Sequence, residues 1–235
     1  MNTLLQIFYR PKAAFQALKD SEKFPTMSLI FLLIIVTINN ILMIPVTTKV
    51  SELTLSTMAM QIGEDQMEYA SLLLYKMRYL TVIFGIFSYG IMLLIYTLLI
   101  WIISKISKCT LSFQKTFELM IHCCFVIAIG SLINTLLLYG QGIENIDSIY
   151  KVSLTGLNLL TTPESVGVTL YTFLTLINPF QIWFLFLLTV GAAVLADIKY
   201  SKAYIISFIL WAIITLYPVV MIYISQTLLQ SKGLI

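Results

Sequence analysis

The chain has 235 residues, of which 59% are hydrophobic and only 11% are charged, and its mean hydropathy is +0.95. Soluble domains are about 45–50% apolar and about 25% charged, so this composition excludes a soluble domain, a disordered chain and a disulfide-stabilised secreted fold. The net charge of +3 is spread along the chain, which argues against nucleic-acid binding. The composition indicates an all-α membrane protein.

The first 25 residues carry four cations and a short amphipathic pattern. Pro11 stands where a helix would start, and Ala14, Phe15 and Leu18 follow it at helical spacing. Two interpretations are open: a cytoplasmic interfacial helix on the inner leaflet, drawn by anionic lipid, or a cap packed against the bundle. We predict that residues 1–25 form this interfacial segment and that residues 26–235 form the transmembrane domain.

Five uncharged apolar spans follow the N-terminal segment. Each is close to the 17–25 residues needed to cross about 30 Å of hydrocarbon, where a helix satisfies its own backbone groups. They predict a five-transmembrane-helix bundle with spans at Met27–Val46, Tyr79–Ser104, Leu119–Tyr139, Pro179–Ala196 and Ala203–Ile224.

The connections on the predicted outer side are long. In residues 47–78, a helical pattern from Met67 runs into the second span. Thr162-Pro163-Glu164 is typical of a helix start, and it predicts a helix over Pro163–Ile177. At about 22 Å this helix is too short to cross comfortably, and Asn178-Pro179 leaves no room for a turn. We therefore predict a broken helix before the fourth span, either re-entrant or on the outer surface.

The cations predict the topology. Residues 1–25, 105–118 and 197–202 hold nine of the fourteen lysines and arginines, and the opposite side holds five. Cytoplasmic loops of membrane proteins carry the excess of positive charge. We expect the N-terminus in the cytoplasm and the C-terminus outside.

Two stretches of the sequence resemble bacterial Yip1-domain proteins. The first is Ile7-Phe8-Tyr9-Arg10-Pro11-Lys12-Ala13-Ala14-Phe15, and the second begins at Leu176-Ile177-Asn178-Pro179-Phe180 and runs to Gly191. Arg10 departs from the family motif, which often has Asn there, and the long polar N-terminus of the eukaryotic branch is absent. The residues at the positions of the family motifs are Arg10, Pro11, Phe15, Asn178, Pro179, Phe180, Trp183 and Gly191.

The resemblance implies a multi-pass protein of the bacterial plasma membrane, without enzymatic activity. It implies an accessory or scaffold role toward other membrane proteins, including ABC-type export complexes. The expected partners are the lipid bilayer, other membrane proteins or further copies of the chain, and no nucleic acid.

Amide side chains within the apolar spans are the first candidate site. Asn39, Asn40 and Asn134 fall within predicted spans, and Asn178 precedes the fourth. Such amides usually hydrogen-bond to a neighbouring helix. The sharper hypothesis is an outward-facing polar cavity lined by Asn39, Asn134 and Asn178, which would make the protein a small-solute transporter or channel.

His122 is the second candidate, with Glu118 four residues before it, close to the inner interface. A proton or metal role competes with an interfacial hydrogen bond. His122 with Cys123 and Cys124 makes a poor zinc site, because structural zinc needs four convergent ligands. A lipid-modifying enzyme that uses His122 is a weaker hypothesis. We predict no catalytic residue, no metal and no cofactor.

Overall fold

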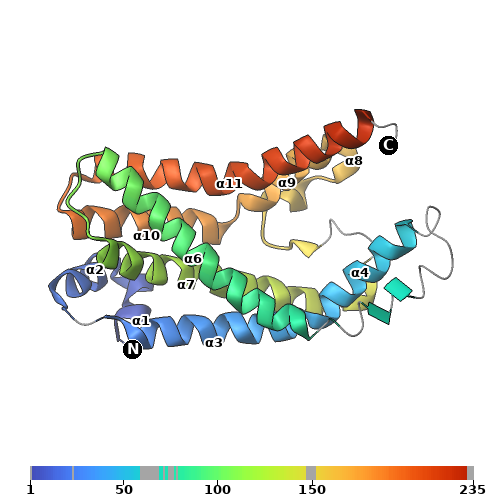
Figure 1. The fold of residues 1–235 in the computed structure, drawn as a ribbon, viewed down its shortest axis with the longest axis horizontal. Coiled ribbons are helices and arrows are strands. Elements are labelled where there is room, and N and C mark those ends of the chain that lie inside the picture. Colours follow the sequence, from blue (N-terminus) through green and yellow to red (C-terminus); the bar gives the residue numbers. More distant parts are fainter. Residues whose placement is uncertain are drawn as a thin grey trace. The chain divides into compact units, whose positions relative to one another are not determined.

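The computed structural model describes residues 2–22, 24–58, 69–70, 72–73, 77, 79–146 and 152–231 (Figure 1). Within these ranges all regular structure is helical. Four of the described helices are long and apolar enough to cross a membrane: α6 (Leu80–Ile106), α7 (Phe113–Gln141), α10 (Pro179–Ala196) and α11 (Tyr200–Ser231). They correspond to the second to fifth predicted spans.

The first predicted span is not one straight helix. It divides into α3 (Thr26–Leu42) and α4 (Ile44–Met58), which are bent by 46° at their junction. Pro45 explains the bend, because it has no N–H to donate and its ring clashes with the preceding turn. The hydroxyls of Thr47 and Thr48 donate to the carbonyls of Met43 and Ile44 at 2.8–3.0 Å. The helix therefore continues beyond Val46 into residues predicted as a loop.

Four crossings follow from the long helices, and a fifth is added if α3 and α4 form one bent span. The count of five therefore stays a prediction. Much of the helical pattern from Met67 lies outside the described residues, and the residues of it that are described, 69–70, 72–73 and 77, are helical.

The chain forms two compact units. Unit 1 comprises Met1–Ser28, Leu93–Ile127 and Thr155–Ile235, and unit 2 comprises Leu29–Met92 and Ala128–Leu154. The predicted boundary near residue 25 concerns position in the membrane, so it stays a prediction.

The N-terminal helices are buried against the rest of unit 1. α1 (Asn2–Tyr9) packs on α2 (Pro11–Asp20), and α2 packs along α10. Ala14, Phe15 and Leu18 are buried, as their spacing predicts. Because protein covers this apolar face, the structure favours the cap over a helix that inserts its apolar face into lipid.

The helix predicted over Pro163–Ile177 is two helices. α8 (Pro163–Val166) and α9 (Val168–Leu176) are separated by Gly167, whose φ is +79°. With its ψ of 152°, this conformation is open essentially to glycine alone, so Gly167 ends one helix and starts the next. Before them lies the 3₁₀ helix η3 (Leu157–Leu160), and α9 packs against both η3 and α11. The segment before α10 is therefore broken at Gly167 as well as at the predicted break before Pro179.

Unit 2 has its own small core. Val46 of α4, Leu138 of α7 and Ile146, which follows the 3₁₀ helix η1 (Ile143–Asn145), are fully or nearly buried together. Met43, Leu53, Ile143, Val152 and Leu154 pack around them.

Candidate functional site

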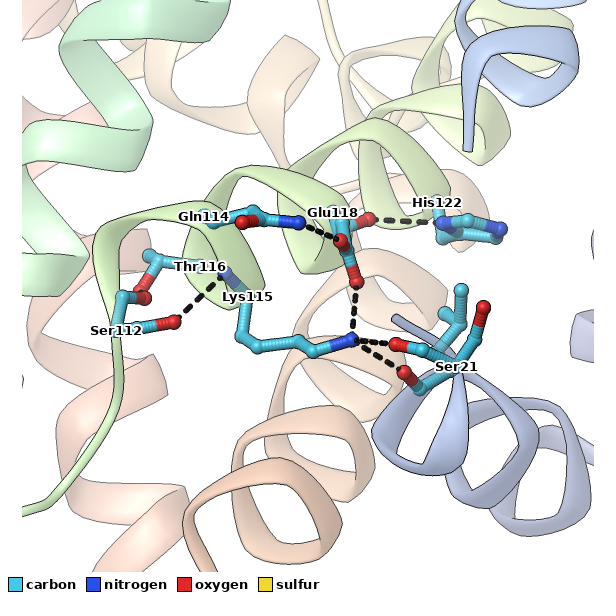
Figure 2. Close-up of polar contacts among 8 residues, drawn as sticks. Ser21, Ser112, Gln114, Lys115, Thr116, Glu118 and His122 are labelled. Carbon is cyan, nitrogen blue, oxygen red and sulfur yellow. Dashed lines mark hydrogen bonds and ion pairs between the residues drawn. The ribbon is translucent and has the colours of Figure 1, made fainter. Parts of the chain in front are cut away.

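A buried polar cluster lies at the start of α7, and we call it the α7 cluster: Gln114, Lys115, Glu118 and His122, with Ser28 and the end of α2. Figure 2 shows the four α7 side chains of this cluster beside Ser21. Ser112 begins the helix, because its hydroxyl accepts from the Lys115 N–H at 3.2 Å in the manner of an N-cap. Helical spacing then carries residues 114, 115, 118 and 122 along the first three turns.

Glu118 is the centre of the α7 cluster. Its side chain is 0% exposed, and its two oxygens accept from Lys115 Nζ at 3.0 Å and from Gln114 Nε2 at 3.1 Å. A buried carboxylate is stable only when it is paired and hydrogen-bonded. Lys115 therefore neutralises Glu118.

Lys115 also holds the end of α2. Its Nζ donates to the backbone carbonyls of Leu18 and Ser21, each at 2.6 Å, in addition to its bond with Glu118. All three ammonium donors are thus used. The last carbonyls of a helix have no intrahelical partner and attract cations, so Lys115 satisfies the C-terminus of α2 from another helix. Figure 2 shows this lysine reaching from α7 toward Ser21.

His122 is fully buried, and protein groups satisfy both ring nitrogens. Nδ1 donates to the backbone carbonyl of Glu118 at 2.8 Å, and Nε2 lies 3.4 Å from the hydroxyl of Ser28. Because a carbonyl only accepts, Nδ1 carries a hydrogen, and in the neutral ring Nε2 accepts from Ser28. Glu118 and His122 are both 0% exposed, so neither side chain is open at the surface of the protein.

The two family-like stretches meet beside this cluster. Gly191 of α10 lies so close to Phe15 and Leu119 that an added Cβ would overlap the Leu119 side chain and approach the Phe15 ring to 3.0 Å. The Phe15 ring also makes an edge contact with His122, with centroids 6.5 Å apart. The glycine is therefore required for the close packing of α2, α7 and α10.

Asn178 caps α10. Its side-chain oxygen accepts from the Gln181 N–H at 3.0 Å, and its amide donates to the Thr175 carbonyl at 3.3 Å. Pro179 occupies the first helical turn, as predicted, and Phe180 is half-buried. Trp183 contacts Phe186 with ring centroids 5.1 Å apart, and its indole N–H is buried without a hydrogen-bond partner among the described residues.

The other candidate amides lie in unit 2 and have partners there. Asn39 accepts from Thr135 at 2.8 Å and donates to Ser131 at 3.1 Å, which joins α3 to α7. Asn134 donates to the Val152 carbonyl at 2.9 Å and accepts from the Leu154 N–H at 2.7 Å. The structure therefore brings Asn39 and Asn134 into hydrogen bonds that suit helix packing.

Asn40 has a different environment. Its amide nitrogen is buried without a hydrogen-bond partner among the described residues, and it faces Gly85 of α6. A Cβ at residue 85 would come within 2.7 Å of that nitrogen, so Gly85 allows the close approach of α3 and α6.

The roles of Lys115 and Ser28 were not predicted from the sequence. Lys115 counted only as a loop cation, although its i,i+3 spacing to Glu118 was the available signal. The bond between Ser28 and His122 joins residues 94 positions apart, and no local pattern predicts such a pair. Cys109, Cys123 and Cys124 are buried, and within the described residues they form no disulfide. The same part of the chain contains no group of three or more residues suited to hold a metal.

The family model described as the Yip1 domain matches residues 5–222, which is nearly the whole chain. The chain belongs to the Yip1 family. The match includes both family-like stretches, so the close approach of Phe15 and Gly191 joins two parts of the Yip1 domain that are far apart in the sequence. Searches of curated proteins and of solved structures gave no significant match.

Proposed function

We propose that this Yip1-domain protein is a non-enzymatic scaffold that binds other membrane proteins through the exposed faces of its apolar helices. The exposure of α6 carries the proposal. In the most apolar 18-residue stretch of α6, only 17% of the residues are buried. In the corresponding stretches of α7 and α10, 56% are buried. The buried residues of α6 lie on one side of the helix at Leu93, Thr97, Ile100 and Ser104, which leaves most of its circumference open.

A stripe of small and large side chains follows the open side of α6. Ile83, Phe87, Leu94 and Leu98 are exposed, and Gly90 lies on the same side with no atom within 4 Å of an added Cβ. Helices associate in lipid through van der Waals packing, which a small residue among large ones improves. This stripe, residues 83–98 on the open side of α6, would accept a partner helix. In the proposal the partner belongs to an export complex of the ABC type or is a second copy of the chain.

Satisfied amides support a scaffold more than a solute path. Asn39 and Asn134 are committed to hydrogen bonds within unit 2, and Asn178 caps a helix in unit 1. A transporter would need these groups available to a solute. Proteoliposome flux that disappears in Asn178→Leu would favour the transporter instead.

Site-specific photo-crosslinking in intact membranes tests the scaffold. A crosslinker at Phe87 or Leu94 on the stripe should give discrete bands, identified by mass spectrometry as one integral membrane protein or as the dimer. The matched control is Leu93, which is adjacent to Leu94 and buried. Bands that are equally strong from Leu93 and Leu94, or no protein band from either stripe position, would contradict the proposal.

We further propose that the protein lies in the bacterial plasma membrane with its N-terminus in the cytoplasm. Within unit 1, Lys115 bonds to the end of α2, and Lys19 Nζ lies 3.9 Å from the carboxylate of Asp197. These two contacts support the proposal that the three cation-bearing stretches share one side of the membrane, as the positive-inside rule requires. An impermeant reagent in intact cells should label a tag at the C-terminus and not one at the N-terminus. Equal labelling of both would overturn this topology.

A further inference from the structure

An open groove lies between the start of α2 and the middle of α10. Its volume is about 550 Å³, and it is lined by residues 10–13 and Gln16 on one side and by Phe186 and Val190 on the other. All of these residues belong to unit 1. The groove therefore brings cationic residues and an apolar helix face together.

Charge in the groove is positive. Arg10 and Lys12 are exposed, and neither forms an ion pair with the carboxylates that the structure describes. Gln16, which also lines the groove, donates to Asp20 at 3.3 Å, one turn further along α2. Guanidinium and ammonium groups bind phosphate, so the cationic edge suits a phosphate group.

The apolar side of the groove continues along α10. Phe186 is 44% exposed and Ile182, one turn earlier on the same face, is 60% exposed. From Leu187 to Ala196, by contrast, nearly every residue of α10 is buried. The groove thus lies where α10 passes from an exposed to an enclosed environment, with the cations at that boundary. An acyl chain that lay along this exposed face would have one end next to Arg10 and Lys12.

We propose that this groove binds one anionic phospholipid. The phosphate contacts Arg10 and Lys12, and an acyl chain lies along Phe186 and Ile182. Arg10 and Lys12, which form no ion pair within the described part of the chain, lie next to an exposed apolar face. This combination matches a lipid, whereas a free phosphate would use only the cations. This inference does not depend on the proposed scaffold function.

Native mass spectrometry of the full chain in mild detergent tests the site. Phosphatidylglycerol should give a complex with one bound lipid, and phosphatidylcholine with the same acyl chains should bind at least tenfold more weakly. Replacing both cations in Arg10→Gln/Lys12→Gln should weaken phosphatidylglycerol binding about tenfold or more. The matched control is Lys199→Gln/Lys202→Gln, which removes the same charge outside the groove and should keep wild-type binding.

A second variant separates the groove from its charge. Ala13 is exposed and lines the groove, so Ala13→Trp fills the space and keeps both cations. It should weaken lipid binding as the charge variant does, with an unchanged circular dichroism spectrum and thermal midpoint. Wild-type binding by Ala13→Trp, or equal loss in both charge variants, would overturn the site. Glycerophosphate, which lacks acyl chains, should not compete; if it did, the groove would bind a soluble anion and not a lipid.

Discussion

The two ends of α7 hold buried polar groups by different means. Near the start of the helix, Lys115 and Glu118 carry opposite charges, and the cation also bonds to the end of α2. Toward its other end, Asn134 and Thr135 are uncharged and bond to a backbone segment and to Asn39. An unpaired charge in an apolar interior costs far more than an unpaired amide. Substitutions of the polar residues near the start of α7 should therefore destabilise the protein more than substitutions near its other end.

Removal of the cation from the α7 cluster should have the largest effect. Lys115→Met would leave the carboxylate of Glu118 buried without its counter-charge and would remove the ammonium donor from the carbonyls of Leu18 and Ser21. Breaking such a pair costs about 3–5 kcal/mol. The free energy of unfolding in detergent, measured by SDS titration, should fall by that amount.

Two controls make this result specific to the pair. Lys199→Met removes an exposed lysine and should leave the free energy of unfolding unchanged within about 0.5 kcal/mol. The double variant Lys115→Met/Glu118→Leu removes both charges and should be more stable than Lys115→Met alone. If the two variants were equally unstable, the charge pairing described for Glu118 would be incorrect.

Disruption of the close packing around Gly191 should cause the second-largest loss of stability. Gly191→Ala adds a methyl group that overlaps Leu119 and approaches Phe15, and overpacking of this kind costs about 1–3 kcal/mol. Gly90→Ala is the matched control, because nothing lies within 4 Å of its added Cβ. In thermal unfolding, Gly191→Ala should lower the midpoint and Gly90→Ala should not. Unchanged stability of Gly191→Ala would mean that α2, α7 and α10 can separate at no cost.

The amide region at the other end of α7 should give the smallest effect. Asn134→Leu removes two hydrogen bonds to residues 152–154, and hydrogen bonds in membrane helices contribute about 0.6 kcal/mol on average. We expect the free energy of unfolding of Asn134→Leu, measured by the same SDS titration, to fall by about 1 kcal/mol. Replacement of the neighbouring exposed residue in Ile133→Leu should leave it unchanged. A loss as large as that of Lys115→Met would remove the distinction between the two regions.

Local signals predicted α10 from the sequence to the residue. Its observed bounds, Pro179–Ala196, equal the predicted ones because Asn178 caps the start and Asp197 ends the helix in a left-handed conformation. The burial of Phe15 and its neighbours on α2 was also predicted from helical spacing. What covers that face was not, because an amphipathic pattern is the same whether the apolar side meets lipid or protein.

Two kinds of feature could not be predicted from the sequence: contacts between residues far apart in the chain, and local backbone conformations that break or bend a helix. The carbonyls that Lys115 binds at the end of α2 are up to 97 residues away in the sequence. Periodic patterns relate residues a few positions apart, so they do not predict a contact of this kind. The break at Gly167 depends on a positive φ, which the presence of a glycine allows but does not require. Likewise the bend beyond Leu42 follows from Pro45, but its 46° angle depends on surrounding contacts.

The bond from Lys115 to Leu18 has a consequence for synthesis of the chain. Ribosomes add about 5–20 residues per second, so the 97 residues between donor and acceptor take about 5 to 20 s to translate. During that interval the newly made α2 lacks both its anchor and the helix α10 that later covers its apolar face. We expect the nascent segment to wait at the bilayer surface and to move onto the protein only after the downstream helices have been inserted.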